Sequence, residues 1–175
     1  VVDVSASGSF ATHQAFKRDI ITEIAATLAF SATQNNDKVG LILFSSKIEL
    51  YIPPKKGRSH VLRIIRELIE FKPEEKTTDI GNALKFLSDV LKKRSIAFVL
   101  SDFVDDDYKR KIQIAAQKHD ITGIRIYDRR ETELPNVGLI KVTDNETGKQ
   151  MWVNTSSKKT RLNYAQYFKA RGDYF

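Results

Sequence analysis

Short, wholly apolar runs that alternate with amphipathic segments constrain the fold of this chain more than any other feature. Residues 39–44 and 96–100 are apolar at nearly every position, which is typical of strands buried on both faces. Apolar residues recur at helical spacing in four further segments, 13–34, 60–71, 79–92 and 107–119. This alternation predicts an α/β fold with a mainly parallel central sheet and helices on both of its faces.

The remaining segments complete the predicted sheet and add a C-terminal element. Residues 48–52 alternate in polarity and precede Pro53-Pro54, so we expect an antiparallel edge strand that pairs with 39–44 as a hairpin. Residues 121–127 return to a strand pattern. We expect a further hairpin and a helix over about 138–172, with its turn at 145–148. No repeat or linker divides the chain, so we expect one domain over 1–175.

The bulk properties exclude several classes of protein. The chain has 175 residues and no cysteine, which excludes disulfides, thiolate metal sites and cysteine nucleophiles. No apolar run approaches the roughly 18 residues that span a bilayer. We therefore expect no membrane segment here and a cytoplasmic location, with any membrane association made through regions outside this sequence. Because Val1 already reads as strand, we expect the first strand to be truncated and the chain to be an excised fragment.

The formal net charge of +7 could favour an acidic partner or nucleic acid. The positive residues are scattered in small clusters, however, and no aromatic residues are interleaved with them as in a nucleic-acid-binding module. We interpret them as solvated helix faces and loops and expect no nucleic-acid partner.

Oxygen-bearing side chains follow the predicted strands at the points where ligands bind in such sheets. Asp3, Ser5 and Ser7 follow the first strand, Thr78 precedes a helix, and Asp102 follows the strand 96–100. In an open α/β sheet, ligands bind beyond the carboxyl ends of parallel strands. Carboxylates and hydroxyls without thiolate or imidazole suit Mg²⁺, or Mn²⁺ or Ca²⁺. A shallow site of this kind would accept an outside carboxylate as its last ligand.

Each of these residues also has a plainer interpretation. Asp and Ser near position 3 favour helix N-caps, and Thr78 or Asp79 could cap the helix that follows them. The acidic run 105–107 could bind a second cation, but it fits better as the cap of the next helix, where it would complement the helix dipole.

The order and spacing of the three segments resemble a known site. Asp-Val-Ser-Ala-Ser at 3–7, Thr78 about seventy residues later, and Asp102 after the next core strand are similar to the metal-ion-dependent adhesion site of von Willebrand factor A domains. The resemblance implies a Rossmann-like A domain in which Ser5, Ser7 and Thr78 coordinate the cation. It implies that Asp3 and Asp102 act directly or through water. Many A domains have Asp-Gly at the third segment, whereas Phe103 follows Asp102 here.

A narrower resemblance covers nearly the whole chain. Its ordered motifs are Asp37-Lys38-Val39-Gly40-Leu41, Tyr51-Ile52-Pro53-Pro54-Lys55-Lys56-Gly57-Arg58, Leu100-Ser101-Asp102-Phe103, Leu134-Pro135-Asn136-Val137-Gly138 and Asp144-Asn145-Glu146-Thr147-Gly148. The set resembles the uncharacterised bacterial family whose genes accompany MoxR-type AAA+ ATPases. This implies that the partner supplying an acidic residue to the metal is a MoxR-type ATPase or a client that it remodels.

We therefore expect a non-enzymatic, metal-dependent protein-binding module that works in the assembly or maturation of other proteins. The alternative is a Mg²⁺-dependent phosphotransfer enzyme with Asp3 as nucleophile, although Ser5 stands where such enzymes carry a second carboxylate. A serine hydrolase lacks support, because the Gly-x-Ser-x-Gly elbow is missing. The three dispersed histidines are expected to lie at the surface or to pack, and Trp152 and the aromatic group 164–168 are expected to pack, rather than to bind ligands.

Overall fold

The computed structural model of the protein describes residues 1–5, 11–73, 75, 77–105, 108–127, 133–143 and 150–172, without the side chains of 11–17 and 170–172. The chain forms two compact units, Val1–Ile126 (unit 1) and Tyr127–Phe175 (unit 2). Whether both act as one domain over 1–175 stays a prediction. None of the helices in the described ranges combines the length and apolar character that crossing a membrane requires.

Unit 1 is built on a five-stranded sheet in the order β3-β2-β1-β4-β5. Its strands are β1 (Val2–Asp3), β2 (Val39–Phe44), β3 (Ile48–Lys55), β4 (Ile96–Ser101) and β5 (Asp120–Arg125). The short strand β1 lies between β2 and β4 and runs parallel to both, and β5 is parallel to β4. Only β3, at one edge, is antiparallel to its neighbour. The predicted mixed α/β, Rossmann-like architecture is therefore confirmed.

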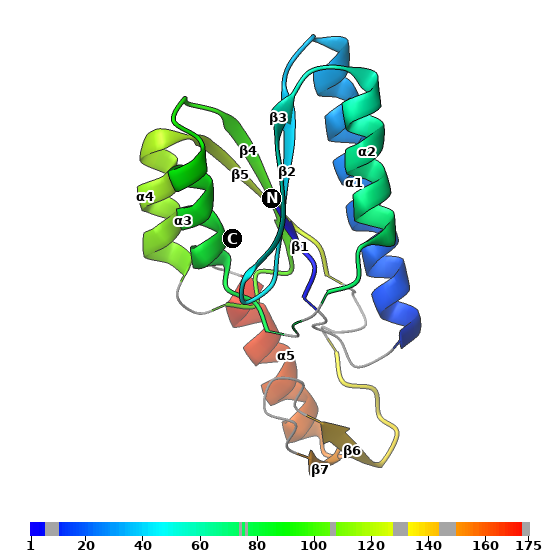
Figure 1. Ribbon diagram of the computed structural model, residues 1–175. Helices are drawn as coiled ribbons and strands as arrows, with labels where there is room; N and C mark the ends of the chain where they lie inside the picture. Colours follow the sequence, from blue (N-terminus) through cyan, green and yellow to red (C-terminus); the bar gives the residue numbers. More distant parts are fainter. Residues whose placement is uncertain are drawn as a thin grey trace. The chain divides into compact units, whose positions relative to one another are not determined.

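Two pairs of helices cover the two faces of this sheet (Figure 1). Helices α1 (Ala11–Gln34) and α2 (Arg58–Glu70) lie on one side, and α3 (Ile80–Val90) and α4 (Tyr108–Lys118) lie on the other. Helices α2 and α3 bury the apolar stripes that their sequences predict. In α2 the buried residues are Val61, Ile64 and Leu68, and in α3 they are Ile80, Gly81, Ala83, Leu84 and Leu87. Residues three and four apart share one helix face, so each stripe meets the sheet.

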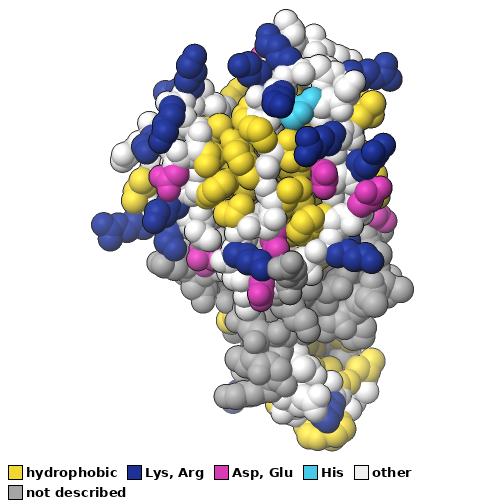
Figure 2. Space-filling model, viewed as in Figure 1, with side chains coloured by type: hydrophobic (Ala, Val, Ile, Leu, Met, Phe, Trp, Pro, Cys, Tyr) yellow, Lys and Arg dark blue, Asp and Glu magenta, His cyan; other side chains and the backbone are white. Residues whose placement is uncertain are grey.

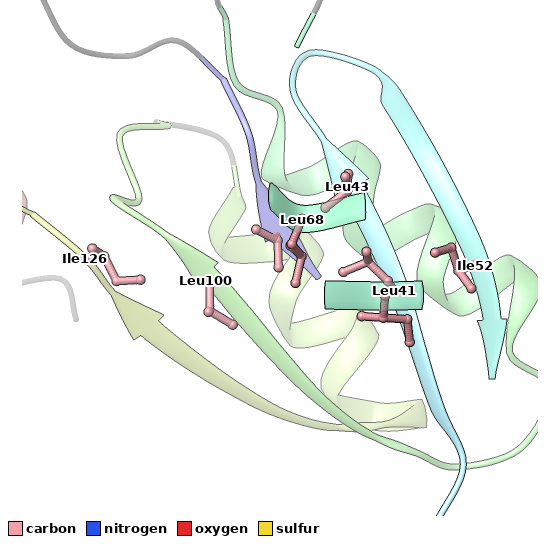
Figure 3. Packing of buried hydrophobic residues seen from close by; sticks show 8 residues of the cluster. Leu41, Leu43, Ile52, Leu68, Leu100 and Ile126 are labelled. Carbon is pink, nitrogen blue, oxygen red and sulfur yellow. The ribbon is translucent and has the colours of Figure 1, made fainter. Parts of the chain in front are cut away.

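The apolar strand runs feed two cores because successive side chains of a strand point to opposite faces. Leu41 and Leu43 of β2 join a cluster with Leu68 of α2 and Leu100 of β4 (Figure 3). Phe44 of β2 instead packs with Ile80, Leu84, Val99 and other residues on the α3 and α4 side. This two-sided burial explains why β2 and β4 are apolar at almost every position.

The edge strand β3 is longer than predicted, because it continues through Pro53 and Pro54 to Lys55. Proline is tolerated there because the outer side of an edge strand needs no ladder donor. The pairing shifts register between Val39 and Leu41. At Gly40, between them, an added Cβ would lie 3.0 Å from the carbonyl oxygen of Ile52 and the nitrogen of Pro54. The glycine therefore permits the close approach of the two strands.

Unit 2 contains a hairpin and a helix. Strands β6 (Leu139–Thr143) and β7 (Gln150–Asn154) pair antiparallel, and α5 spans Lys158–Gly172. The predicted turn at 145–148 lies outside the described residues. The buried Thr155 hydroxyl donates to the Gly138 carbonyl at 2.6 Å and accepts from the Val137 N–H at 3.0 Å, which ties the two strands together.

The predicted packing of the aromatic residues in unit 2 is only partly correct. Phe168 contacts Tyr127, with ring centroids 6.0 Å apart. Trp152, by contrast, is 65% exposed, so the prediction that it packs in a core is wrong. Trp152 pairs across the hairpin with Lys141, and a two-stranded sheet buries side chains only where another element covers it.

Candidate functional site

Three segments meet at the carboxyl edge of the sheet in unit 1. Asp3 ends β1 and Ser101 ends β4, and because Val2 pairs with Leu100 in parallel register, both strands end at the same edge. The third segment is held there by the N–H of Asp79, which donates to the carbonyl of Ser45, just after β2, at 3.0 Å. The predicted convergence of these segments therefore follows from strand order.

Three of the predicted site residues are in direct contact. The Thr78 hydroxyl donates to the Ser5 hydroxyl at 2.6 Å and lies 3.5 Å from Oδ2 of Asp3. The N–H of Ser5 donates to Oδ1 of Asp3 at 2.9 Å. Asp3, Ser5 and Thr78 thus form one hydrogen-bonded group, although Thr78 is 75 positions from Asp3. Ser7, the other predicted ligand of the first segment, lies outside the described residues.

Asp102, the predicted ligand of the third segment, lies next to this group. Its side chain is buried, and Oδ1 accepts the N–H of Val104 at 3.2 Å. Its carbonyl accepts the Arg125 Nε–H at 3.2 Å. The negative charge of Asp102 contributes to the raised pKa of Asp3, so the two carboxylates interact electrostatically.

Burial makes the side chain of Asp3 a weaker acid than an exposed aspartic acid. Desolvation raises the pKa of Asp3 to about 6, and the charge of Asp102 adds to the rise, while hydrogen bonds from Ser101 and Ser5 oppose it. Burial disfavours the charged form of a carboxyl group, and so does a neighbouring like charge. A bound cation would offset both effects.

The donor set fits a hard divalent cation. Two carboxylates and two hydroxyls from Ser5 and Thr78 offer oxygen atoms only, which suits Mg²⁺ better than zinc or copper. Within the described ranges, no group of three or more His, Cys, Asp or Glu side chains is placed to hold a metal. A site of this composition rests on hydroxyls for its remaining ligands.

Sequence reasoning overlooked one residue of the group. The hydroxyl of Ser101, which is 1% exposed, donates to Oδ2 of Asp3 at 2.6 Å and accepts the N–H of Phe103 at 3.0 Å. Ser101 is the last residue of β4 and so stands beside the end of β1. Its place at a strand end, directly before Asp102, is the sequence feature that could have indicated a role in this group.

The N-terminus of α3 is capped by two carboxylates. Oδ1 of Asp79 accepts the N–H of Asn82 at 2.7 Å, which confirms Asp79 as a cap. Oδ2 of Asp105 accepts the N–H of Ile80 at 2.9 Å. Asp105 thus reaches back to α3, and the prediction that the acidic run 105–107 caps the next helix stays a prediction, because residues 106 and 107 lie outside the described ranges.

Phe103 adopts a backbone conformation that normally favours glycine. Its φ angle is 58°, in the left-handed region, and its side chain is buried. The ring meets that of Tyr108 edge-on, with centroids 5.5 Å apart. The position that carries Gly in many A domains thus keeps a glycine-like backbone, which costs roughly 1–2 kcal/mol in a residue with a Cβ.

Two of the three histidines have described side chains, and neither is among the site residues. Nε2 of His60 lies 2.9 Å from the carbonyl oxygen of Val39. His119, just after α4, is 1% exposed, and neither of its ring nitrogens has a hydrogen-bond partner among the described residues. The side chain of His13 is not described.

On the face of unit 1 seen in Figure 2, Lys and Arg side chains surround a central group of apolar side chains, with Asp and Glu between them. The positive charge on this face is therefore distributed, as the scattered clusters in the sequence predict.

Comparison with known proteins places the chain in a family. Residues 1–173 match the family described as "Protein of unknown function DUF58". The uncharacterized proteins Mb1516 of Mycobacterium bovis and Rv1480 of Mycobacterium tuberculosis are each 28% identical over 151 residues, covering 85% of this chain and 48% of their own length. The chain thus spans about half the length of these curated relatives.

Two solved structures share the fold at low sequence identity. An aerotolerance-related membrane protein from Bacteroides fragilis, with multiple mutations to serines, gives a TM-score of 0.61 at 14% identity, covering 98% of this chain and 85% of that one. The conserved hypothetical protein BatB from Bacteroides thetaiotaomicron gives 0.59 at 16% identity, covering 96% and 84%. Because the family match extends over residues 1–173, the chain belongs to the DUF58 family.

Proposed function

We propose that unit 1 is a metal-ion-dependent protein-binding module of the von Willebrand factor A type. The observation that carries this proposal is the hydrogen-bonded group of Asp3, Ser5 and Thr78 beside the buried Asp102. These residues come from three distant segments, and a helix cap alone would not require their convergence. The wider resemblance of the sequence to A domains supports the same assignment.

In this proposal, Asp3, Ser5, Ser7, Thr78 and Asp102 hold Mg²⁺, with Mn²⁺ or Ca²⁺ as substitutes. Two carboxylates balance the charge of the ion, and the hydroxyls supply neutral oxygen ligands. Mg²⁺ prefers six ligands and usually retains waters. A carboxylate of another protein would replace one such water, so the bound ion would bridge the two proteins without any reaction being catalysed.

The proposed partner is a MoxR-type AAA+ ATPase or a client protein that it remodels. Support comes from the resemblance of the ordered sequence motifs to the family whose genes accompany such ATPases. The net charge of +7 would speed the approach of an acidic partner.

Cation binding is tested by calorimetric titration of the chain with Mg²⁺ and Mn²⁺. We expect saturable binding that Asp102→Ala abolishes and that Asp89→Ala, which changes a carboxylate farther along α3, leaves intact. Equal binding by both variants would contradict the assignment of Asp102 as a ligand.

Partner binding is tested by capture of the ATPase on the immobilised chain in Mg²⁺ and in EDTA. We expect capture in Mg²⁺ only, and its loss in Asp3→Ala even when Mg²⁺ is present. Capture that EDTA and Asp3→Ala both leave undiminished would refute a metal-bridged contact.

The phosphotransfer alternative is less well supported. Asp3 is buried, and Ser5 stands where such enzymes carry a second carboxylate as general acid. Incubation with a generic phosphate ester and Mg²⁺ separates the two functions. Turnover that Asp3→Asn abolishes would favour the enzyme.

A further inference from the structure

The loop that follows β4 is bonded to both of the other segments of the candidate site. Ser101, at the end of β4, donates to Oδ2 of Asp3 at 2.6 Å. Asp105, four residues later, accepts the N–H of Ile80 at 2.9 Å. Asp102 lies between these two contacts along the chain. The segment that carries Asp102 is therefore hydrogen-bonded to the segments that carry the other proposed ligands.

The hydroxyl of Ser101 is buried and its hydrogen bonds fix its orientation. Its hydroxyl is 1% exposed and has two partners, donating to Asp3 and accepting from the N–H of Phe103 at 3.0 Å. With the donor and the acceptor of the hydroxyl both engaged, its orientation is fixed. Because the N–H of Ser5 holds Oδ1 of Asp3, the Ser101 hydroxyl at Oδ2 sets the rotation of the carboxylate.

The Asp105 contact acts on Thr78 through the helix that follows it. Ile80 is the first residue of α3, and Thr78 stands two residues before it. The N–H of Ile80 has no partner within its own helix, because the first four N–H groups of a helix lack one. The Asp105 carboxylate supplies that partner, and so holds the end of α3 at the distance where the Thr78 hydroxyl reaches Ser5, 2.6 Å away.

We propose that Ser101 and Asp105 are positioning residues of the cation site: Ser101 orients the carboxylate of Asp3, and Asp105 places Thr78 by anchoring the start of α3. The proposal rests on the proposed cation-binding function and adds two residues that do not themselves touch the ion. Partners of this kind change metal affinity by about 10- to 100-fold in well-studied sites.

The test is a Mn²⁺ titration of the whole chain, with the electron paramagnetic resonance signal of free Mn²⁺ as the readout. We expect Ser101→Ala and Asp105→Ala, which remove the donor to Asp3 and the acceptor for the Ile80 N–H, each to raise the Kd for Mn²⁺ about tenfold or more. Ser101→Thr, which keeps the hydroxyl, is expected to stay within about threefold of the unaltered chain. Far-UV circular dichroism of each variant in metal-free buffer establishes that the fold is retained.

Matched controls come from α3. Ser88 donates only to the carbonyl of Leu84 in the same helix, at 3.0 Å, and lies eight residues, about 12 Å, beyond Ile80. Ser88→Ala and Asp89→Ala remove the same groups away from the site, and we expect both to leave the Kd within about twofold.

Each outcome decides between the proposals. Saturable binding by the unaltered chain that Ser101→Ala and Asp105→Ala leave within twofold would overturn the positioning roles while the cation site stands. An effect of Ser88→Ala as large as that of Ser101→Ala would also overturn them, since the loss of affinity would then reflect a general loss of stability. No binding by the unaltered chain would overturn the cation site and the positioning roles together. If Ser101→Ala does not fold, the comparison of Asp105→Ala with Asp89→Ala decides the same question.

Discussion

Replacing Asp3 by Asn is expected to stabilise the metal-free chain progressively as the pH rises from 4 to 7.5. Asp3 is 8% exposed, and burial raises its pKa to about 6 from an ordinary value of 3.8. A raised pKa means that the folded chain binds this proton more tightly than the unfolded chain does. The stability that protonated Asp3 contributes is therefore complete below pH 3.8 and is lost as the pH rises towards 6.

The size of the effect follows from the shift. A difference of roughly 2 units, at 1.36 kcal/mol per unit, amounts to about 3 kcal/mol of unfolding free energy by pH 7.5. Asn carries no charge, so the Asp3→Asn variant does not lose this unfolding free energy as the pH rises. Any hydrogen bond that Asn makes less well with Ser5 or Ser101 is equally weak at every pH. The change in the difference between the two proteins across the pH range therefore isolates the ionisation of Asp3.

The assay is urea unfolding at pH 4, 5, 6 and 7.5 in metal-free buffer, followed by far-UV circular dichroism. Asp120→Asn is the control, because a hydrogen bond from Arg94 at 2.6 Å lowers the pKa of Asp120 below its ordinary value of 3.8. The stability that this carboxylate contributes is already present above pH 3.8, so the difference between Asp120→Asn and the unaltered chain should stay nearly constant from pH 4 to 7.5. A difference for Asp3→Asn that stays flat over this range would refute the burial of an ionised carboxylate at this site. Added Mg²⁺ should stabilise the unaltered chain at pH 7.5 but not Asp3→Asn.

Three further predictions concern the surroundings of the site and the stability of unit 1. Phe103→Gly and Phe103→Ala should both destabilise the chain by about 2–5 kcal/mol through lost packing. The Gly variant should be more stable than the Ala variant by about 1 kcal/mol, because glycine tolerates the left-handed backbone. Urea unfolding measures this order, and a more stable Ala variant would contradict backbone strain at Phe103. His119→Leu should stabilise the chain by about 1–3 kcal/mol at pH 7.5, since it removes ring nitrogens without partners. Burial lowers the pKa of His119, so the folding stability of the unaltered chain that is present above pH 6.5 is lost as the pH falls. The stability advantage of the Leu variant should therefore be larger at pH 5.5 than at pH 7.5. A smaller advantage at pH 5.5 would contradict the lowered pKa. Arg18→Gln should speed hydrogen exchange in the last turn of α2 about tenfold, because the Arg18 guanidinium donates to the carbonyls of Leu68, Ile69 and Phe71; exchange unchanged in α2 would mean that the cap contributes nothing.

Most elements of the fold were predictable because their signals are local. Helices α2 and α3 follow from apolar residues at helical spacing, and their observed bounds differ from the predicted ones by two residues or fewer at each end. Strands β2 and β4 follow from apolar runs that feed both cores. The extension of β3 through Pro53 and Pro54 was not predictable, because whether proline breaks a strand depends on which neighbour lies beside it.

The sequence indicates candidate residues for the site, and their role as cation ligands stays a prediction, but it does not indicate how they are arranged. Asp3, Ser5, Thr78 and Asp102 stand out as oxygen side chains at strand or helix ends, and ordering along the chain relates them to a known site. The contribution of Ser101 depends on the strand neighbouring β4, and that of Asp105 on the helix end that it reaches. Trp152 shows the opposite failure, since its apolar character predicts burial while its place on a two-stranded hairpin leaves it 65% exposed.

The alternation of strands and helices, the edge position of β3 and the oxygen-bearing side chains at the strand ends can all be read from the amino-acid order, because periodicity and side-chain chemistry act within a few residues of one another. Only the tertiary structure decided that β1 lies between β2 and β4, which brings Asp3 to the hydroxyls of Ser101 and Thr78. The same packing decided the burial that raises the pKa of Asp3. Both outcomes depend on which distant segments exclude water from a side chain, and no local pattern specifies that.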